Sequence, residues 1–253
     1  MMIRKVVSSV LIILSLAGCA GLGTILQDGG VGGSGPLTNS EIIQGLKEAL
    51  RVGISNGSNQ ASQVNGYFGN ALIKILMPPE AQKVEKALRQ IGLGSEVDKF
   101  ILSLNRAAED AAKKAKPIFF TAITSMTIQD ALGILNGSDT AATAYLRRTS
   151  GVALFNSFYP VVDSTLQLNQ ATRYYSDIVN TYNKIPFVQK VDPDLKRYAT
   201  NKAIDGLFLL VADEERKIRT DPVARVSQIL KRVFGSGNNT QNTAPPRLTP
   251  SGY

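Results

Sequence analysis

The chain has 253 residues, with 28 Lys and Arg, 20 Asp and Glu, and a formal net charge of +8. It contains no His, no Trp and one Cys, so it cannot build a His-dependent nucleophile, a His or multi-Cys zinc site, or an intramolecular disulfide. A hydrophobic content of 43% and a charged content of 19% exclude a chain that is disordered throughout. The length suits one domain or two small ones.

The first 19 residues, MMIRKVVSSVLIILSLAGC, have the pattern of a lipoprotein signal. Two basic residues precede an apolar run at 6–17, which is shorter than the roughly 20 residues that a membrane-spanning helix needs. The run ends in Leu-Ala-Gly-Cys, which resembles the bacterial lipoprotein box, in which cleavage precedes the Cys and its thiol is acylated. We therefore expect residues 1–18 to be a signal peptide and Cys19 to carry membrane lipid.

Acylation at Cys19 predicts a protein of the bacterial cell envelope. Each buried methylene contributes about 0.8 kcal/mol, and two or more acyl chains hold a protein stably at a bilayer. Ala20 stands where an Asp favours retention in the inner membrane of enterobacteria, so we expect the outer membrane, facing the periplasm. Removal of the signal takes away Arg4 and Lys5 and lowers the formal net charge from +8 to +6.

Two segments of biased composition flank one predicted domain. Seven of the residues in 20–37 are Gly, so 19–37 is predicted to be a flexible tether with a reach of roughly 20–25 Å. Residues 236–253 are polar, rich in Asn, Thr and Pro, and are predicted to form a disordered tail. The helical domain is therefore expected at 38–235, which shows no internal repeat.

The first part of this domain gives mixed signals. Thr38 and Glu41 have the spacing of a capping box, which predicts a helix beginning there. The Gly-, Ser- and Asn-rich stretch 53–70 predicts a loop or a weak helix, and the short apolar run 71–77 fits either a strand or a helix. Pro79 is placed to start a helix through 91, which two glycines then end.

The strongest helical pattern begins at Ser95. One face of this predicted helix is an apolar stripe. The face opposite the stripe is charged and offers the pairs Glu109–Lys113 and Asp110–Lys114. Pro117 is expected to kink or end the helix. The apolar stripe consists of Val97, Ile101, Leu104, Ala108, Ala111 and Ala115.

The rest of the domain also reads as helices, so we predict an all-α fold, bundle-like, of roughly seven to nine helices. Thr127 caps a short helix at 128–135, and Pro222 starts the last helix, with Val226, Ile229, Leu230 and Val233 as its core face. The uncharged run 206–212 is expected to be buried nearly all round. The other predicted helices are 140–158, with a restart at Pro160, then 170–184 and 194–219.

Five strings, in order, resemble a bacterial envelope family known as domain of unknown function 4197. The resemblance covers most of 38–235 and implies a helical, exported, often lipid-modified protein, without implying any chemistry. The Gly-rich tether and the polar tail depart from the family pattern. The strings are NRAAEDAAKKAKPIF (105–119), MTIQDALGILNG (126–137), AATAYLRRT (141–149), KRYATNKAIDGLFLLVADEERKIRTDPVAR (196–225) and ILKRVFG (229–235).

Several polar residues are candidates for a site. The densest acidic cluster is Asp213, Glu214 and Glu215, but consecutive side chains point about 100° apart on a helix and cannot converge. The pairs Asp213–Lys217 and Glu215–Arg219 favour a salt-bridged face instead. A polar network or pocket could gather Asn105, Arg106, Glu109, Asp205, Glu214 and Arg219.

The tyrosines and the common cofactor-binding motifs are the other candidates for a site. Tyr174, Tyr175, Tyr182 and Tyr198 fit either a ligand groove or helix packing with the hydroxyl at the rim. The sequence has no Walker loop, no Rossmann fingerprint and no Gly-x-Ser-x-Gly elbow, so we expect no cofactor, no metal and no assigned catalytic residue. The cations are scattered among acids, which argues against nucleic acid. Phospholipid headgroups or lipopolysaccharide are the anions expected instead, and simple solubility is the favoured explanation of the positive charge.

We therefore predict a lipid-anchored envelope protein that acts as a non-enzymatic interaction or ligand-binding module at the membrane surface. Its expected partners are membrane lipid, through Cys19, and an envelope protein, with the oligomeric state left open. One alternative is a carboxylate- or Lys-dependent enzyme that uses Glu109, Asp205, Glu214 or Glu215. Another alternative is a carrier of apolar ligands between helices.

Overall fold

The computed structural model describes residues 37–168, 170–184, 186–187, 190–192 and 194–235. The predicted signal peptide, Cys19, nearly all of the tether and the tail lie outside the described residues. Within them the regular secondary structure is helical, which confirms the all-α fold. The α-helices are α1 (Asn39–Ser62), α2 (Gln82–Gln90), α3 (Gly94–Ala112), α4 (Ala115–Thr124), α5 (Ile128–Leu135), α6 (Ala141–Leu168), α7 (Ala171–Tyr182), α8 (Leu195–Thr220) and α9 (Gln228–Gly235), with short 3₁₀ turns at Pro79–Ala81 and Pro222–Ala224.

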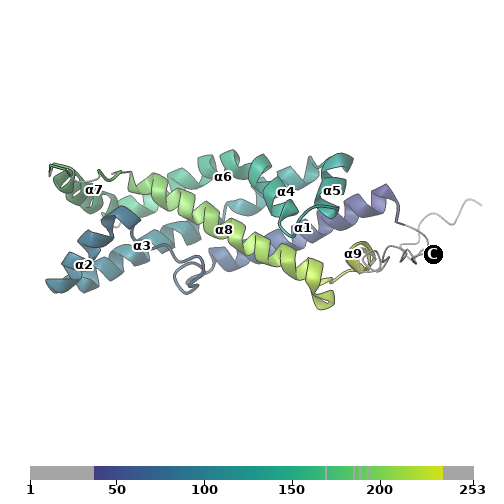
Figure 1. Cartoon of the computed structure of the whole chain (residues 1–253), viewed down its shortest axis with the longest axis horizontal. Helices are drawn as coiled ribbons and strands as arrows, with labels where there is room; N and C mark the ends of the chain where they lie inside the picture. Colours follow the sequence, from purple (N-terminus) through teal and green to yellow (C-terminus); the bar gives the residue numbers. More distant parts are fainter. Residues whose placement is uncertain (1–36, 169, 185, 188–189, 193, 236–253) are drawn as a thin grey trace, which may run out of the picture. The chain divides into compact units, whose positions relative to one another are not determined.

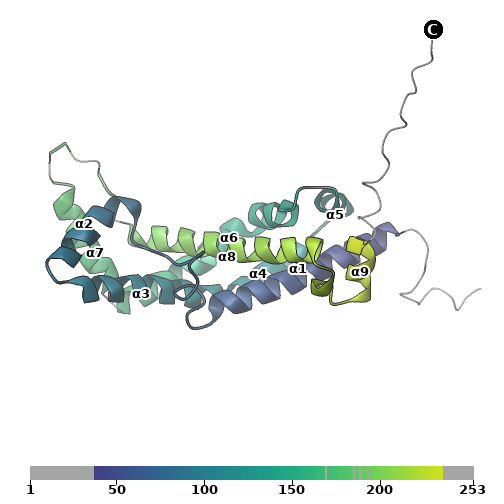
Figure 2. The ribbon, with the colours of Figure 1, turned by 60° about the horizontal axis from the view of Figure 1, so that its bottom comes forward.

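Four long helices, α1, α3, α6 and α8, form the centre of the domain (Figure 1). α8 packs against each of the other three, and α4 and α5 pack on α1 and α6. α2 packs on α3, and α7 packs on α6 and α8; both lie at the end where α8 begins, whereas α9 lies beside α1 at the other end (Figures 1 and 2). The peripheral helices that could form a site are thus divided between the two ends of the helical domain.

The core is continuous through these central helices. Phe119 of α4 meets Phe208 of α8 edge to face, with ring centroids 5.6 Å apart. Phe208 belongs to the run 206–212, which is buried as expected except for Ala212, which is half-buried, and Leu209, whose exposed fraction is 56%. The large side chains that are fully buried come from distant parts of the sequence and include Leu46, Tyr67, Leu104, Phe119, Leu146, Phe158 and Phe208.

The helix caps predicted at Thr127 and Thr38 form in the structure. The Thr127 hydroxyl accepts a hydrogen bond from the Asp130 backbone N–H, and the Asp130 carboxylate accepts one from the Thr127 N–H, both at 3.1 Å. Hydrogen bonds from the side chain and backbone of Thr127 hold the pKa of Asp130 below its usual value. The capping box at Thr38 and Glu41 also forms. Pro117 lies in the first turn of α4, after α3 has ended, as predicted.

The two alternatives left open over 53–70 both occur, because α1 continues through Ser62 and a turn follows it. Gly53 and Gly57 lie on one face of α1, against α8. A Cβ atom at Gly57 would lie 3.5 Å from the Leu210 backbone, and one at Gly53 would lie 3.3 Å from Glu214 Cβ. Only the distance at Gly53 is tighter than an ordinary van der Waals contact. Each glycine costs about 1 kcal/mol in helix propensity, and the packing of α1 on α8 offsets this cost.

The predicted break at Pro160 was wrong, because α6 runs through this residue to Leu168. Leu154, Phe158, Val162 and Leu166 recur every four residues around the proline, and all are fully buried. A proline in a helix interior costs about 3 kcal/mol. Burial of one large apolar side chain contributes about 1.5–3 kcal/mol, so the packed face outweighs the local penalty.

The last helix begins later than predicted. Asp221 accepts a hydrogen bond from the Val223 N–H and starts only a 3₁₀ turn, and α9 begins at Gln228. Between them the buried Arg225 donates to the carbonyls of Ile218 and Arg219, so its side chain satisfies the end of α8. The chain turns to allow this contact. Ile229, Leu230 and Val233 are buried as predicted, but Val226, at 68% exposed, is not.

Candidate functional site

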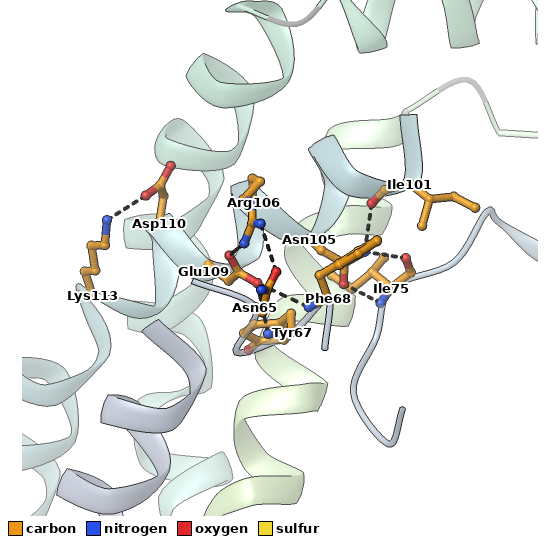
Figure 3. Close-up of polar contacts among 10 residues, drawn as sticks. All are labelled: Asn65, Tyr67, Phe68, Ile75, Ile101, Asn105, Arg106, Glu109, Asp110 and Lys113. Atoms are coloured by element: carbon orange, nitrogen blue, oxygen red, sulfur yellow. Dashed lines mark hydrogen bonds and ion pairs between the residues drawn. The ribbon is translucent and has the colours of Figure 1, made fainter. Parts of the chain in front are cut away.

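Three predicted site residues of α3 act together on the connection between α1 and α2 (Figure 3). The Glu109 carboxylate, 4% exposed, accepts hydrogen bonds from the backbone N–H groups of Tyr67 and Phe68 at 3.1 and 3.2 Å. Its second oxygen pairs with Arg106, which also donates to the Asn65 side chain at 2.9 Å. This carboxylate is therefore fully engaged in holding a turn in place.

The inward direction of Glu109 corrects the predicted surface pairs of α3. Lys113 pairs with Asp110 at 2.7 Å and not with Glu109, and Asp110 uses this lysine and not Lys114 (Figure 3). The pair of Arg106 and Glu109 forms as the i,i+3 spacing suggested. Periodicity placed Glu109 on the charged face, but the backbone donors of residues 67 and 68 draw it into the interior.

Asn105 decides the conformation of the apolar run 71–77. Its side-chain amide accepts from the Ile75 N–H and donates to the Ile75 carbonyl, both at 2.8 Å, in the manner of a neighbouring strand. The described segment is therefore neither a strand nor a helix, but a turn followed by an extended stretch. Ile73, Ile75 and Met77 are buried, and the residues between them point outward.

Tyr67 completes this network, although no sequence pattern singled it out. Its hydroxyl donates to the Ala203 carbonyl of α8, and burial raises the pKa of the phenol well above its ordinary value. Its ring packs against Gly206, where a Cβ atom would lie 2.7 Å from the ring. The available signal was the placement of Tyr67 between Gly66 and Gly69, which marks a tight turn around one large side chain.

A second buried carboxylate, Glu215 of α8, satisfies the start of α6. It is 8% exposed and accepts from the N–H groups of Ala142 and Thr143 at 3.0 and 2.8 Å, and from the Thr143 hydroxyl at 2.8 Å. Arg219 pairs with it at 2.9 Å, as predicted, and donates to the Ile134 carbonyl at the end of α5. The ion pair of Glu215 and Arg219 thus caps the start of α6 and the end of α5, two helix ends of opposite polarity.

The remaining acidic candidates lie apart from both networks. Asp205 pairs with Arg147 at 2.9 Å, with both side chains about half exposed. Glu214 accepts from Asn56 at 2.7 Å and from Lys217, and Asp213 pairs with Lys217 as predicted.

The predicted grouping of Asn105, Arg106, Glu109, Asp205, Glu214 and Arg219 in one pocket is therefore corrected. The α3 residues turn toward the connection at 63–78, whereas the α8 residues point to different faces of their helix. Among the described residues there is no group of three or more Asp, Glu, Cys or His that could hold a metal ion.

The tyrosines have two described positions that bear on a groove. The Tyr198 hydroxyl donates to the Leu76 carbonyl at 3.1 Å, and the Tyr175 hydroxyl donates to the Asp192 carbonyl at 3.4 Å. Burial raises the pKa of both phenols to about 12. The side chains of Tyr174 and Tyr182 lie outside the described residues.

A groove of about 630 Å³ lies between α2, α3 and α7. α2 contributes Val84 and Leu88, four residues apart on one face and only half-buried. Tyr175 stacks on Phe100 beside them, with ring centroids 6.1 Å apart. The sequence offered the spacing of the two α2 residues as a signal, but nothing showed which helix they faced. The lining residues are Met77, Ala81, Val84, Leu88, Leu93, Glu96, Val97, Lys99, Phe100, Leu102, Ser103, Arg106, Ala171 and Tyr175.

Among the described residues no single helix is long and apolar enough to cross a bilayer. α4 and α5 reach the length and apolar composition of a span only when taken together, and the two helices are bent by 106° relative to each other.

Comparison with known proteins gives one match. A family model described as a protein of unknown function (DUF4197) matches residues 36–235. No curated protein and no solved structure matches the chain.

Proposed function

Since the chain belongs to the DUF4197 family of proteins of unknown function, we propose its role from its geometry: it is a non-enzymatic module that binds an amphipathic ligand with an apolar chain. The observation that carries the proposal is the groove between α2, α3 and α7. Its volume of about 630 Å³ lies within the range of roughly 300–1,000 Å³ that is typical of ligand pockets.

The lining of the groove supports an amphipathic ligand. Val84 and Leu88 of α2, together with Phe100 and Tyr175, offer apolar surface that the protein itself covers only in part. The polar lining residues, Glu96, Lys99, Ser103 and Arg106, follow one another along α3 in steps of three and four, so they form one stripe. An apolar chain would lie against α2 and α7, with its head group on this stripe.

The stripe offers an exposed cation to a head group. Lys99 pairs with Glu96 at 2.9 Å, but its side chain is 71% exposed and can also reach a ligand, whereas Arg106 is held by Glu109. The carboxylates that an enzyme would use have other roles: Glu109 and Glu215 accept hydrogen bonds from backbone N–H groups at a turn and at a helix start. We therefore favour binding of a fatty acid or a similar single-chain anion over the carboxylate-dependent enzyme.

Replacement of both Val84 and Leu88 by glutamine tests the groove. We expect oleate to displace anilinonaphthalene sulfonate from the unaltered protein and to bind the double variant at least about tenfold more weakly, because apolar contacts worth about 1.4 kcal/mol or more are lost. Val152→Gln is the matched control, since Val152 lies on α6, is 77% exposed and does not line the groove. Equal oleate affinity in all three proteins would contradict the proposal.

We also propose that an acyl group on Cys19 holds this module at the outer membrane, facing the periplasm. The lipobox-like sequence at 16–19 and the Ala at position 20 support this location. Cys19→Ala is expected to release the protein from the membrane fraction, because no acyl chain is then attached. Ser15→Ala, within the apolar run, is the control that should stay bound. Retention of the Cys19→Ala variant in membranes would exclude acylation as the anchor.

A further inference from the structure

The connection between α7 and α8 contains a loop that is pinned at its base. Asn183 accepts a hydrogen bond from the Val191 N–H and donates to the Val191 carbonyl, both at 2.8 Å. Val191 is 6% exposed and belongs to the core, so the base of the loop is fixed to the domain. The described parts of the connection stand clear of the helices in Figure 2. The described residues between Asn183 and Val191 are exposed.

The described residues of this loop present an aromatic ring between two cations. Phe187 is 108% exposed, the highest exposed fraction among the large apolar side chains that the structure describes. Its φ of 63° lies in the left-handed region, which bulky residues rarely adopt. Lys184, Pro186 and Lys190 are also exposed. The nearest acidic residue that follows, Asp192, is paired with Arg197 and so does not neutralise the lysines.

We propose that this loop inserts Phe187 into the surface of a bilayer that contains anionic lipid, with Lys184 and Lys190 on the headgroups. Aromatic side chains favour the interface between headgroups and acyl chains. A lysine near an anionic surface strengthens binding about fivefold. One exposed ring with two flanking cations is far smaller than the roughly 800 Å² per partner that a stable protein interface buries, whereas it suits a lipid surface.

This inference rests on the proposed function and extends it. α7 contributes Ala171 and Tyr175 to the groove and leads directly into the loop. Insertion of Phe187 therefore brings the α2–α3–α7 groove to the membrane from which an acyl ligand would come. The lipid of the bilayer and the ligand of the groove are bound by different residues, so they can be tested separately.

The absence of Trp from the chain makes a direct measurement possible. Phe187→Trp introduces one indole at the proposed contact, and Val223→Trp is the matched control, because Val223 is 85% exposed in a turn beyond the other end of α8. α8 has 26 residues and separates the two positions by roughly 39 Å. Residues 36–253 form a compact unit by themselves, so both variants are made in residues 20–253, where no acyl chain or signal adds membrane affinity.

The probe is a vesicle of equal parts phosphatidylcholine and phosphatidylglycerol, compared with pure phosphatidylcholine. We expect the emission of the Phe187→Trp protein to shift to shorter wavelength with anionic vesicles and to be quenched by brominated acyl chains, while the Val223→Trp emission stays unchanged. Lys184→Gln with Lys190→Gln should weaken vesicle binding about 25-fold, from about fivefold for each lysine, and Phe187→Ala should weaken it about tenfold.

Three outcomes would overturn the inference. These are an unchanged Phe187→Trp emission with anionic vesicles, an equal shift at Val223→Trp, or binding that the lysine and Phe187→Ala variants leave intact. Oleate binding in the absence of vesicles is measured on the same proteins. If oleate binds but the loop does not respond to vesicles, the inference fails and the proposed function stands; if the loop responds and oleate does not bind, the groove proposal fails instead.

Discussion

Glu215→Ala is expected to lower the free energy of unfolding by about 4 kcal/mol, because it removes one partner of a buried ion pair. The Arg219 side chain, 13% exposed, would keep its charge in the interior without the carboxylate. The N–H groups of Ala142 and Thr143, at the start of α6, would also lose their acceptor. Urea unfolding followed by circular dichroism measures the change.

The control for Glu215 is two residues away on the same helix. Asp213 is 39% exposed and pairs with Arg216 and Lys217 at the surface. Surface ion pairs contribute about 0–1 kcal/mol, so Asp213→Ala should change the free energy of unfolding by less than about 1 kcal/mol. A Glu215→Ala protein as stable as the Asp213→Ala protein would show that Glu215 does not cap α6.

Glu109→Ala is expected to lower the free energy of unfolding by about 3 kcal/mol. The N–H groups of Tyr67 and Phe68 lose their acceptor, at about 1–3 kcal/mol for each buried group. Arg106 is a third exposed, so its charge regains water and adds little to the loss. For a domain of this size the melting temperature should fall by about 6–12 °C, as measured by calorimetry.

Two further variants separate the hydrogen bonds of Glu109 from its charge. Glu109→Gln keeps a carbonyl oxygen for the N–H groups and removes the ion pair with Arg106, so we expect a smaller loss of about 1–2 kcal/mol. Asp110→Ala, at the exposed neighbour that pairs with Lys113, should change stability by less than about 1 kcal/mol. Equal losses for Glu109→Ala and Asp110→Ala would contradict the role of Glu109 in the turn.

Local signals in the sequence predicted much of the helical domain. Thr127 with Asp130 forms a capping box from four adjacent residues, so the start of α5 depends on nothing distant. Asp213 and Lys217 pair because residues four apart meet on any helix. Among the polar candidates, Asn105, Glu109 and Arg219 make buried or partly buried contacts.

The errors share one physical cause, which is packing between distant segments. Local propensity ends a helix at Pro160, but the packing of α6 on neighbouring helices outweighs this penalty. The grouping of the polar candidates failed because a side chain's partner is set by the element that faces it. Asn105 faces Ile75, 30 residues away, and no spacing rule relates the two.

The sequence by itself determined the helical class and most helix starts of this protein, because capping, periodicity and proline placement act within a few residues. Its five strings indicated the family. Only the tertiary structure decided which surfaces remain open. The groove exists because Ala171 and Tyr175 of α7 lie beside α2 and α3, which are distant from α7 in sequence. Packing between distant segments therefore decides where the groove proposed for a ligand lies.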